Sequence, residues 1–217
     1  NEFFDAMPVH RVNQRGGTLH ELFVRVKNDQ FADVVAPLST PRLAEYFSKQ
    51  GITLQDGQRT EISLSACDWI ADAARRLERG FVLTIDYGYA ARVLYSERFP
   101  RGTLLAYRSH RVSEDFYAAP GEQDLTAHVN FTALDLWGGD AGLAQAGIVP
   151  QSRFLLALGR ANEFADLYDP GQSETDRIRA QMQLSRLLHP EGMGETFQVF
   201  IQRKGIDEAR LTGLTPL

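Results

Sequence analysis

The first part of the chain alternates apolar and polar residues on both sides of a glycine pair. Residues 9–14 and 19–27 flank Gly16 and Gly17, and alternation around such a pair is typical of a β-hairpin. A third extended segment, residues 31–38, would widen the hairpin into a meander. The pattern therefore predicts a small antiparallel sheet near the start of the chain.

A change to helical spacing follows the meander. Ser39 or Thr40 before Pro41 is a good helix start, and Gly51 a good helix end. Between them the apolar residues recur at helical spacing, at Leu43, Tyr46 and Phe47. We expect one short helix here.

A strand, a helix and a second strand are predicted next. Residues 59–64 have the composition of a short strand, and Ser65 can cap a helix that Gly80 ends. The apolar face of this helix comprises Trp69, Ile70, Ala73, Ala74 and Leu77. Residues 81–85 form a nearly continuous apolar run, as in a strand buried on both faces of a parallel sheet. Helix, glycine and buried strand make half of a βαβ unit.

The second half of the chain continues to alternate strands and helices. Strands are predicted at residues 102–107, 148–154 and 196–201, and helices at residues 132–146, 155–167 and 174–188. Three glycines interrupt the first of these helices, Gly138, Gly139 and Gly142. Together these segments predict one α/β protein.

Three segments of the second half lack a regular pattern. Residues 108–128 are polar, and loops of this length inside a compact domain are often functional. Asp169, Pro170 and Gly171 predict a turn between two helices. From Gly205 onward we expect a loose tail.

The amino-acid composition of the chain argues against several classes of function. The formal net charge is -5, and the 23 Lys and Arg residues are scattered, so a nucleic-acid partner is not expected. The single cysteine, Cys67, cannot form an internal disulfide, which fits a reducing intracellular compartment. The apolar runs are too short to cross a bilayer, so we expect a soluble protein without a membrane span. The first residue is Asn1 rather than Met, and the segment resembles the middle of a domain rather than a signal peptide.

Asp86, Tyr87 and Gly88 are the first candidate site residues. They directly follow the strand predicted at residues 81–85, and ligands of open α/β sheets bind outside the carboxyl ends of the strands. The alternative is that Asp86 caps the next segment and Gly88 permits a turn.

A second candidate group lies at the start of the chain. Asn1, Glu2 and Asp5 precede Pro8, which limits residues 2–7 to a short helical segment or turn. Paired carboxylates can bind a guanidinium through two hydrogen bonds and orient it. The alternative is a helix cap with a solvated face.

The third candidate group lies in the polar segment at residues 108–128. His110 and His128 occur there with acids and hydroxyls, a composition that suits a lid or a substrate-recognition loop, although a solvated polar loop has the same composition. The two histidines lack the spacing of a metal site, so no metal is expected. Phosphate-loop and nucleophile-elbow motifs are absent from the sequence.

Four segments of the sequence carry a resemblance to a known family. They are Asn-Glu-Phe-Phe-Asp-Ala-Met-Pro-Val-His at residues 1–10, Asp-Tyr-Gly-Tyr at 86–89, Gly-Glu-Gln-Asp-Leu-Thr-Ala-His-Val-Asn-Phe at 121–131, and Met-Gly-Glu-Thr-Phe at 193–197. In this order they resemble the MidA-like methyltransferases, a family that includes a mitochondrial complex I assembly factor that methylates an arginine. The resemblance implies S-adenosylmethionine as cofactor and a class I, Rossmann-like methyltransferase fold, with a mostly parallel sheet, an antiparallel last strand and a β-rich insertion.

The resemblance also implies which part of the enzyme is present. Family members carry the Gly-rich cofactor loop upstream of the position that matches Asn1, so we expect the amino-terminal half of the cofactor domain to be missing and this polypeptide to bind cofactor poorly. The domains expected are the end of the strand 4 region at residues 1–8, the insertion at 9–64, the carboxyl-terminal half of the methyltransferase domain at 65–205, and a tail at 206–217.

Site roles follow as expectations from the same resemblance. Cofactor contacts are expected from Asn1, Asp86 and Tyr87. For an arginine acceptor, Glu2 would orient the guanidinium with Asp5 as a weaker helper, and His128, or His110, would take up the released proton. Substrate contacts are expected from a segment that covers the site, through His110, Asp124, Thr126 and Phe131.

These expectations define two main functional hypotheses. The first is a methyltransferase that acts on an arginine of a protein, such as a complex I subunit or its bacterial counterpart. The second is a non-catalytic assembly protein with the same fold, and methylation of a small molecule is a third possibility. The expected partners are a protein substrate and a second copy of the chain, in the bacterial cytoplasm or the mitochondrial matrix.

Overall fold

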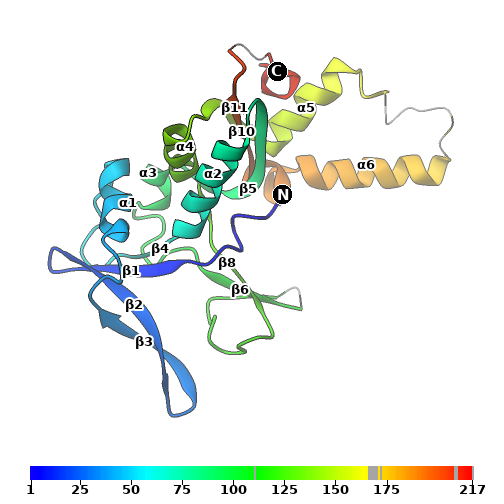
Figure 1. Cartoon of the computed structure of the whole chain (residues 1–217). Helices are drawn as coiled ribbons and strands as arrows, with labels where there is room; N and C mark the ends of the chain where they lie inside the picture. Colours follow the sequence, from blue (N-terminus) through cyan, green and yellow to red (C-terminus); the bar gives the residue numbers. More distant parts are fainter. Residues whose placement is uncertain (110, 166–170, 172, 208–209, 217) are drawn as a thin grey trace. The chain divides into compact units, whose positions relative to one another are not determined.

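The computed structural model describes residues 1–109, 111–165, 171, 173–207 and 210–216 (Figure 1). The chain divides into two compact units. Unit 1 comprises Asn1, Leu77–Tyr87 and Leu143–Leu217, and unit 2 comprises Glu2–Arg76 and Gly88–Gly142. Each unit is described by itself.

Unit 2 contains the meander that the alternating pattern predicts. Its strands are β1 (His10–Arg15), β2 (Thr18–Lys27), β3 (Gln30–Ala36) and β4 (Arg59–Ile62), in the order β3-β2-β1-β4 with antiparallel pairing throughout. Gly16 and Gly17 form the first turn with φ of 58° and 77°, a region that glycine enters without steric cost. In Figure 1 the β2–β3 ribbon (blue) extends away from the helices of this unit. The predicted hairpin and its third strand are confirmed.

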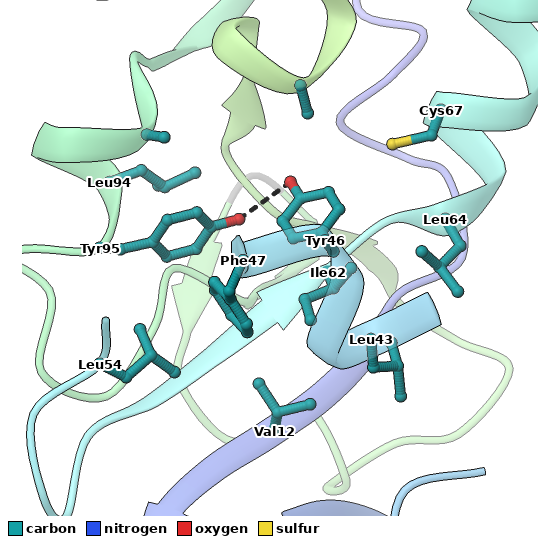
Figure 2. Close-up of a cluster of buried hydrophobic side chains, with 12 residues drawn as sticks. Val12, Leu43, Tyr46, Phe47, Leu54, Ile62, Leu64, Cys67, Leu94 and Tyr95 are labelled. Atoms are coloured by element: carbon teal, nitrogen blue, oxygen red, sulfur yellow. Dashed lines mark hydrogen bonds between the residues drawn. The ribbon is translucent and has the colours of Figure 1, made fainter. Parts of the chain in front are cut away.

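One face of the meander is covered by helices. Helix α1 (Arg42–Gln50) begins after Pro41 and ends at Gly51, and helix α2 is Leu64–Arg76. Figure 2 shows the cluster of buried side chains in this region, in which Val12 of β1 and Ile62 of β4 have no exposed surface. Cys67 is buried in this cluster, as a small apolar residue would be.

The segment predicted as a long polar loop contains two short strands, β7 (Arg111–Ser113) and β8 (Asp124–Thr126), which pair with the strand predicted at residues 102–107. That strand is β6 (Leu105–Arg108), and both pairings are antiparallel. The prediction of an irregular loop is wrong here because strands of three exposed residues leave no hydrophobic alternation to detect. Unit 2 also contains α3 (Ala91–Leu94), β9 (Val129–Asn130) and α4 (Phe131–Asp140).

The sheet of unit 1 has an antiparallel last strand, as expected. β11 (Phe197–Lys204) lies between β10 (Ala144–Pro150) and β5 (Gly80–Tyr89) and is antiparallel to both. Phe81 and Leu83 of β5 are 41% and 50% exposed, so the prediction of a strand buried on both faces is wrong for the described residues. The fold is α/β with an antiparallel last strand, whereas the mostly parallel remainder of the sheet stays a prediction.

Element boundaries in the second half differ from the predicted ones. The helix predicted at residues 132–146 ends at Asp140, since Gly142 takes a φ of 95° and the chain enters β10 at Ala144. The following helix starts at Gln151, directly after Pro150 ends the strand. The ends of these helices and strands are thus determined by glycine and proline rather than by the apolar pattern.

The remaining helices belong to unit 1. They are α5 (Gln151–Ala161), α6 (Glu174–Leu188) and the short turns η2 (Pro190–Gly194) and η3 (Thr212–Leu214). Leu211 and Leu214 pack against the cluster of Val149, Val199 and Ile201, where the sequence predicted a loose tail. The turn predicted at residues 169–171 falls largely outside the described residues. Across the described part of the chain, no helix is long and apolar enough to cross a membrane.

Candidate acceptor site

The segment after Asn1 is held in place by aromatic packing. The rings of Phe3, Phe4 and Trp69 lie 4.9 to 5.3 Å apart in edge-to-face arrangements. Phe4 and Asp5 are buried, and Glu2 is exposed with a φ of 47°. A positive φ is uncommon outside glycine and marks a backbone that its surroundings hold in a costly conformation. Glu2 is therefore an exposed residue on an anchored turn.

A main-chain hydrogen bond joins this turn to a second motif segment. The amide of Ala127 donates to the carbonyl oxygen of Asp5 at 3.0 Å. The residue after Ala127 is His128, the predicted proton acceptor. Two segments separated by more than one hundred residues, both singled out from the sequence, thus lie side by side in unit 2.

His128 sits among aromatic rings. Its ring centroid is 5.5 Å from that of Tyr89 and 5.6 Å from that of Phe99. Burial, and next the nearby positive charge of Arg98, hold the pKa of His128 below its ordinary value of 6.5. His128 is therefore predominantly neutral near pH 7 and able to accept a proton.

Two buried side chains support His128, and neither was predicted as a site residue. The amide of His128 donates to Oγ1 of Thr103 at 3.0 Å, and the carboxylate of Glu61 accepts the Thr103 amide at 2.8 Å. Burial raises the pKa of Glu61 above its ordinary 4.5. Glu61 lies in a short strand, and no sequence motif distinguishes it from a solvated glutamate.

A buried polar network lies next to these groups. The side-chain amide of Asn130 donates to the Tyr46 hydroxyl and to Oε1 of Gln50, both at 2.7 Å. The hydroxyls of Tyr46 and Tyr95 are 3.0 Å apart, the contact drawn as a dashed line in Figure 2. Burial raises the pKa of both tyrosines, so both hydroxyls stay protonated. Asn130 also caps α4, where its side-chain oxygen accepts the Ala133 amide.

A small cavity adjoins the network. It has a volume of about 30 Å³, and its lining includes Phe4, Tyr46, Glu61, His128 and Asn130. This volume is enough for a water molecule but not for a substrate. An acceptor side chain therefore does not bind inside this cavity.

Gly88 positions the strand β9, which begins directly after His128. Gly88 and Tyr89 of β5 pair in parallel with Val129 and Asn130 of β9. A Cβ atom at position 88 would lie 2.0 Å from the carbonyl oxygen of Val129. Gly88 is therefore a strand residue that lets two backbones approach closely, rather than the turn residue considered from sequence.

The predicted cofactor residues lie in unit 1. Asp86 has no exposed surface, and its carboxylate accepts the Tyr87 amide at 2.9 Å. The Tyr87 ring lies 5.4 Å from that of Phe197, and Asn1 is exposed. Their contacts with S-adenosylmethionine stay predictions.

The predicted substrate residues occupy different settings in unit 2. Asp124 is exposed and Thr126 half-buried, and both belong to β8, where they pair with Tyr107 and Leu105. Phe131 is buried at the start of α4, a position that also serves packing. His110 lies outside the described residues. Substrate contacts of all four stay predictions.

Comparison with known proteins gives the family of the chain. The sequence pattern of a family described as putative S-adenosyl-L-methionine-dependent methyltransferases matches residues 1–149, more than half of the chain. The chain belongs to this family. The resemblance to MidA-like methyltransferases is thereby confirmed.

Similar proteins are known from both animals and bacteria. The chain is 29% identical over 205 residues to the mouse protein named "Protein arginine methyltransferase NDUFAF7, mitochondrial", covering 92% of this chain and 44% of the relative. The human protein of the same name is also 29% identical, with 92% and 43% covered. The chain thus spans less than half the length of these curated relatives.

Solved structures from Burkholderia thailandensis resemble the chain closely. One superfamily member matches with a TM-score of 0.86 and 32% identity, over 98% of this chain and 56% of that chain. A second, with a TM-score of 0.85 and 31% identity over 98% of this chain and 54% of that chain, was solved with S-adenosyl-homocysteine bound. S-adenosyl-homocysteine is what S-adenosylmethionine becomes after it loses its methyl group.

Proposed function

We propose that the intact protein transfers a methyl group from S-adenosylmethionine to an arginine side chain of another protein. Membership of the methyltransferase family and the bound product in a solved relative support the methyl donor. The names of the animal relatives support the acceptor. The observation that carries the proposal is the exposed residue Glu2 beside exposed aromatic side chains, on a turn bonded to the His128 segment.

The anchored turn suits a guanidinium group. A carboxylate can accept two parallel hydrogen bonds from a guanidinium. Phe3 and Trp69 are 46% and 41% exposed, and aromatic faces attract guanidinium groups that stack on them. Glu2 would therefore hold the acceptor arginine while one of the two rings fixes its plane.

The protein's part in the reaction is to position the acceptor and to remove a proton. When bound, S-adenosylmethionine supplies a methyl group on a positively charged sulfur. A guanidinium nitrogen forms the new bond to this carbon as the bond from carbon to sulfur breaks, and the nitrogen loses a proton. Glu2 would orient the nitrogen, and neutral His128 would accept the proton. Asp5 keeps the two segments together through its main-chain bond to Ala127.

Titration of the intact gene product with S-adenosylmethionine tests the proposal. We expect saturable binding of one molecule per protein, measured by calorimetry, and transfer of radiolabelled methyl groups to arginine of protein acceptors. A non-catalytic assembly protein would bind no cofactor and transfer no label. Label that appears only in small molecules would contradict the protein acceptor.

We also propose a specific acceptor class and compartment. A subunit of respiratory complex I, or of its bacterial counterpart, is the acceptor that the MidA-like resemblance favours. The relatives with mitochondrial names favour the mitochondrial matrix for a eukaryotic source, and the cytoplasm is proposed for a bacterial one. Loss of one methylarginine from this complex in a strain that lacks the gene, detected by mass spectrometry, would be the expected result.

The pH dependence of turnover should report on His128. Its pKa is held below 6.5, so the neutral base is present above that value and is lost as the pH falls through the lowered pKa. We expect kcat to decrease on the acid side with a midpoint below 6.5, and His128→Gln to abolish this dependence together with most of the activity. A wild-type profile that is retained in His128→Gln would assign the base elsewhere.

A further inference from the structure

The outer face of the meander differs in its residues from the face that covers the core. Residues paired across antiparallel strands point to the same side, which places Arg11, Leu22 and Val35 together, as well as Val24 with Asp33 and Val26 with Phe31. Arg59 joins this face through its pairing with Asn13. Glu61, which is buried, joins it as well through its pairing with Arg11. The outer face therefore carries two arginines and a buried glutamate near β1 and β4 and is mainly apolar along the β2–β3 ribbon.

The loop after β7 is fastened across this face. The Tyr117 hydroxyl donates to Oδ1 of Asp33 at 2.7 Å, and the Arg11 guanidinium donates to the same oxygen at 2.6 Å. The guanidinium also lies 4.6 Å from the centre of the Phe116 ring, and the Tyr117 ring lies 6.0 Å from that of Phe31. These contacts fix the loop on the sheet.

Two hollows adjoin on either side of this loop. One has a volume of about 570 Å³ and runs past Arg59 and Arg98 to His128. The other has a volume of about 470 Å³ and is lined by Val26, Phe31 and Pro120 among others. Both are lined by Asp115 and Tyr117, so they adjoin at this loop, and we name the two together the meander groove. It ends at the predicted proton acceptor.

The two ends of the meander groove favour different side chains. Arg11 is paired with Asp33 and Arg101 with Glu114, whereas Arg59 and Arg98 are exposed and have no carboxylate within ion-pair distance in the described part of the chain.

Arg98 is also held in a fixed position. Its guanidinium lies over the rings of Tyr89 and Phe99, 4.8 and 5.3 Å from their centres. It also donates to the Tyr89 hydroxyl at 3.3 Å. A guanidinium that is fixed in this way and has no carboxylate partner is a strong site for a carboxylate. At the far end, Val26 and Phe31 are 65% and 40% exposed and offer apolar contact.

We propose that the meander groove binds an extended segment of the substrate protein, with an acidic side chain at Arg59 and Arg98 and an apolar side chain at Val26 and Phe31. The inference rests on the proposed function, since it assumes a protein acceptor. The groove brings that segment to His128, next to the turn that carries Glu2. Asp33, Glu114 and Asp115 line the same groove. A nucleic-acid backbone carries a negative charge at every phosphate and would be repelled along its length, whereas a peptide segment needs only one acidic side chain, which favours a peptide.

Selection of peptides on the intact protein tests this proposal. A random dodecapeptide library is selected against the wild type, the double variant Arg59→Glu/Arg98→Glu, and the control Arg92→Glu, which changes an exposed arginine of α3 outside the groove. We expect wild type and control to enrich peptides that combine an acidic and an apolar residue. The double variant should enrich basic residues instead and bind the wild-type peptides about tenfold more weakly.

Further measurements separate the possible outcomes. Val26→Ser should remove only the apolar preference, and cofactor affinity should be unchanged in every variant. Three results would each overturn the proposed role of the groove. The first is that the selected peptides show no acidic enrichment, and the second is that the double variant binds the wild-type peptides with equal affinity. The third is a preference of the wild type for single-stranded RNA that the double variant loses. Methyl transfer assayed on the selected peptides tests the function separately. Binding without transfer contradicts only the proposed function, and transfer that is insensitive to the double variant contradicts only the groove.

Discussion

Replacement of Glu2 with Gln in the intact protein is expected to lower kcat for methyl transfer by about 100-fold or more while cofactor affinity stays nearly unchanged. The amide keeps the size of the side chain but loses the charge that binds and orients the guanidinium. The fold should persist because Glu2 is exposed and the turn is anchored by Phe3, Phe4 and Trp69. The measurements are transfer of radiolabelled methyl groups and calorimetric titration with S-adenosylmethionine.

The matched control for this substitution is Glu45→Gln. Glu45 is an exposed carboxylate in the first turn of α1, within the same unit but outside the anchored turn. We expect wild-type turnover from it. Unchanged turnover in Glu2→Gln would exclude Glu2 as the orienting group, and an equal loss in both variants would show that the effect is not specific to the site.

The elements whose signals lie in the local sequence could be predicted from the sequence alone. The meander is encoded by alternation around Gly16 and Gly17, and α1 by Pro41 at its start and Gly51 at its end. Each of these signals acts within a few residues, through φ restriction or through a side-chain period of two. Nothing distant in the chain is needed to produce them.

Elements that depend on distant partners were not predicted. The strands β7 and β8 have three residues each and are stabilised by pairing with β6, so their own sequences contain too little alternation to reveal them. The exposure of Phe81 and Leu83 is likewise decided by what covers a strand, which the strand's own residues do not encode.

In the candidate site, too, some residues could be predicted from local motifs and others, which act through distant partners, could not. Resemblance of motifs pointed to the Glu2 turn and to His128, and the structure adds the bond between Asp5 and Ala127 that joins the two segments. Glu61 and Thr103 support His128 from positions 25 or more residues away, as the bonded pairs show. A glutamate and a threonine without a motif give no signal of this role in a single sequence. The groove was missed for the same reason, since its residues come from six separate segments, among them β1, β3 and β4.

Gly88→Ala is expected to reduce both stability and turnover, whereas Gly139→Ala should increase stability. A methyl group at position 88 would lie 2.0 Å from the carbonyl oxygen and 2.6 Å from the amide nitrogen of Val129, and both are main-chain atoms that cannot move aside as a flexible side chain can. The pairing of β5 with β9 must therefore give way, at a cost of about 2 to 3 kcal/mol in the free energy of unfolding. His128 would shift with β9, so methyl transfer should fall as well.

Gly139 makes the comparison informative because it is exposed in α4, and a methyl group there meets no atom within 4 Å. Alanine has the higher helix propensity, so this variant should gain up to about 1 kcal/mol. Urea unfolding of both intact variants, followed by circular dichroism, measures the two changes. If both substitutions shifted stability in the same direction, the close approach of β5 and β9 would not be what requires glycine at position 88. Opposite signs, with turnover lost only in Gly88→Ala, would show that this glycine holds β9, and with it the adjacent His128, in the working position.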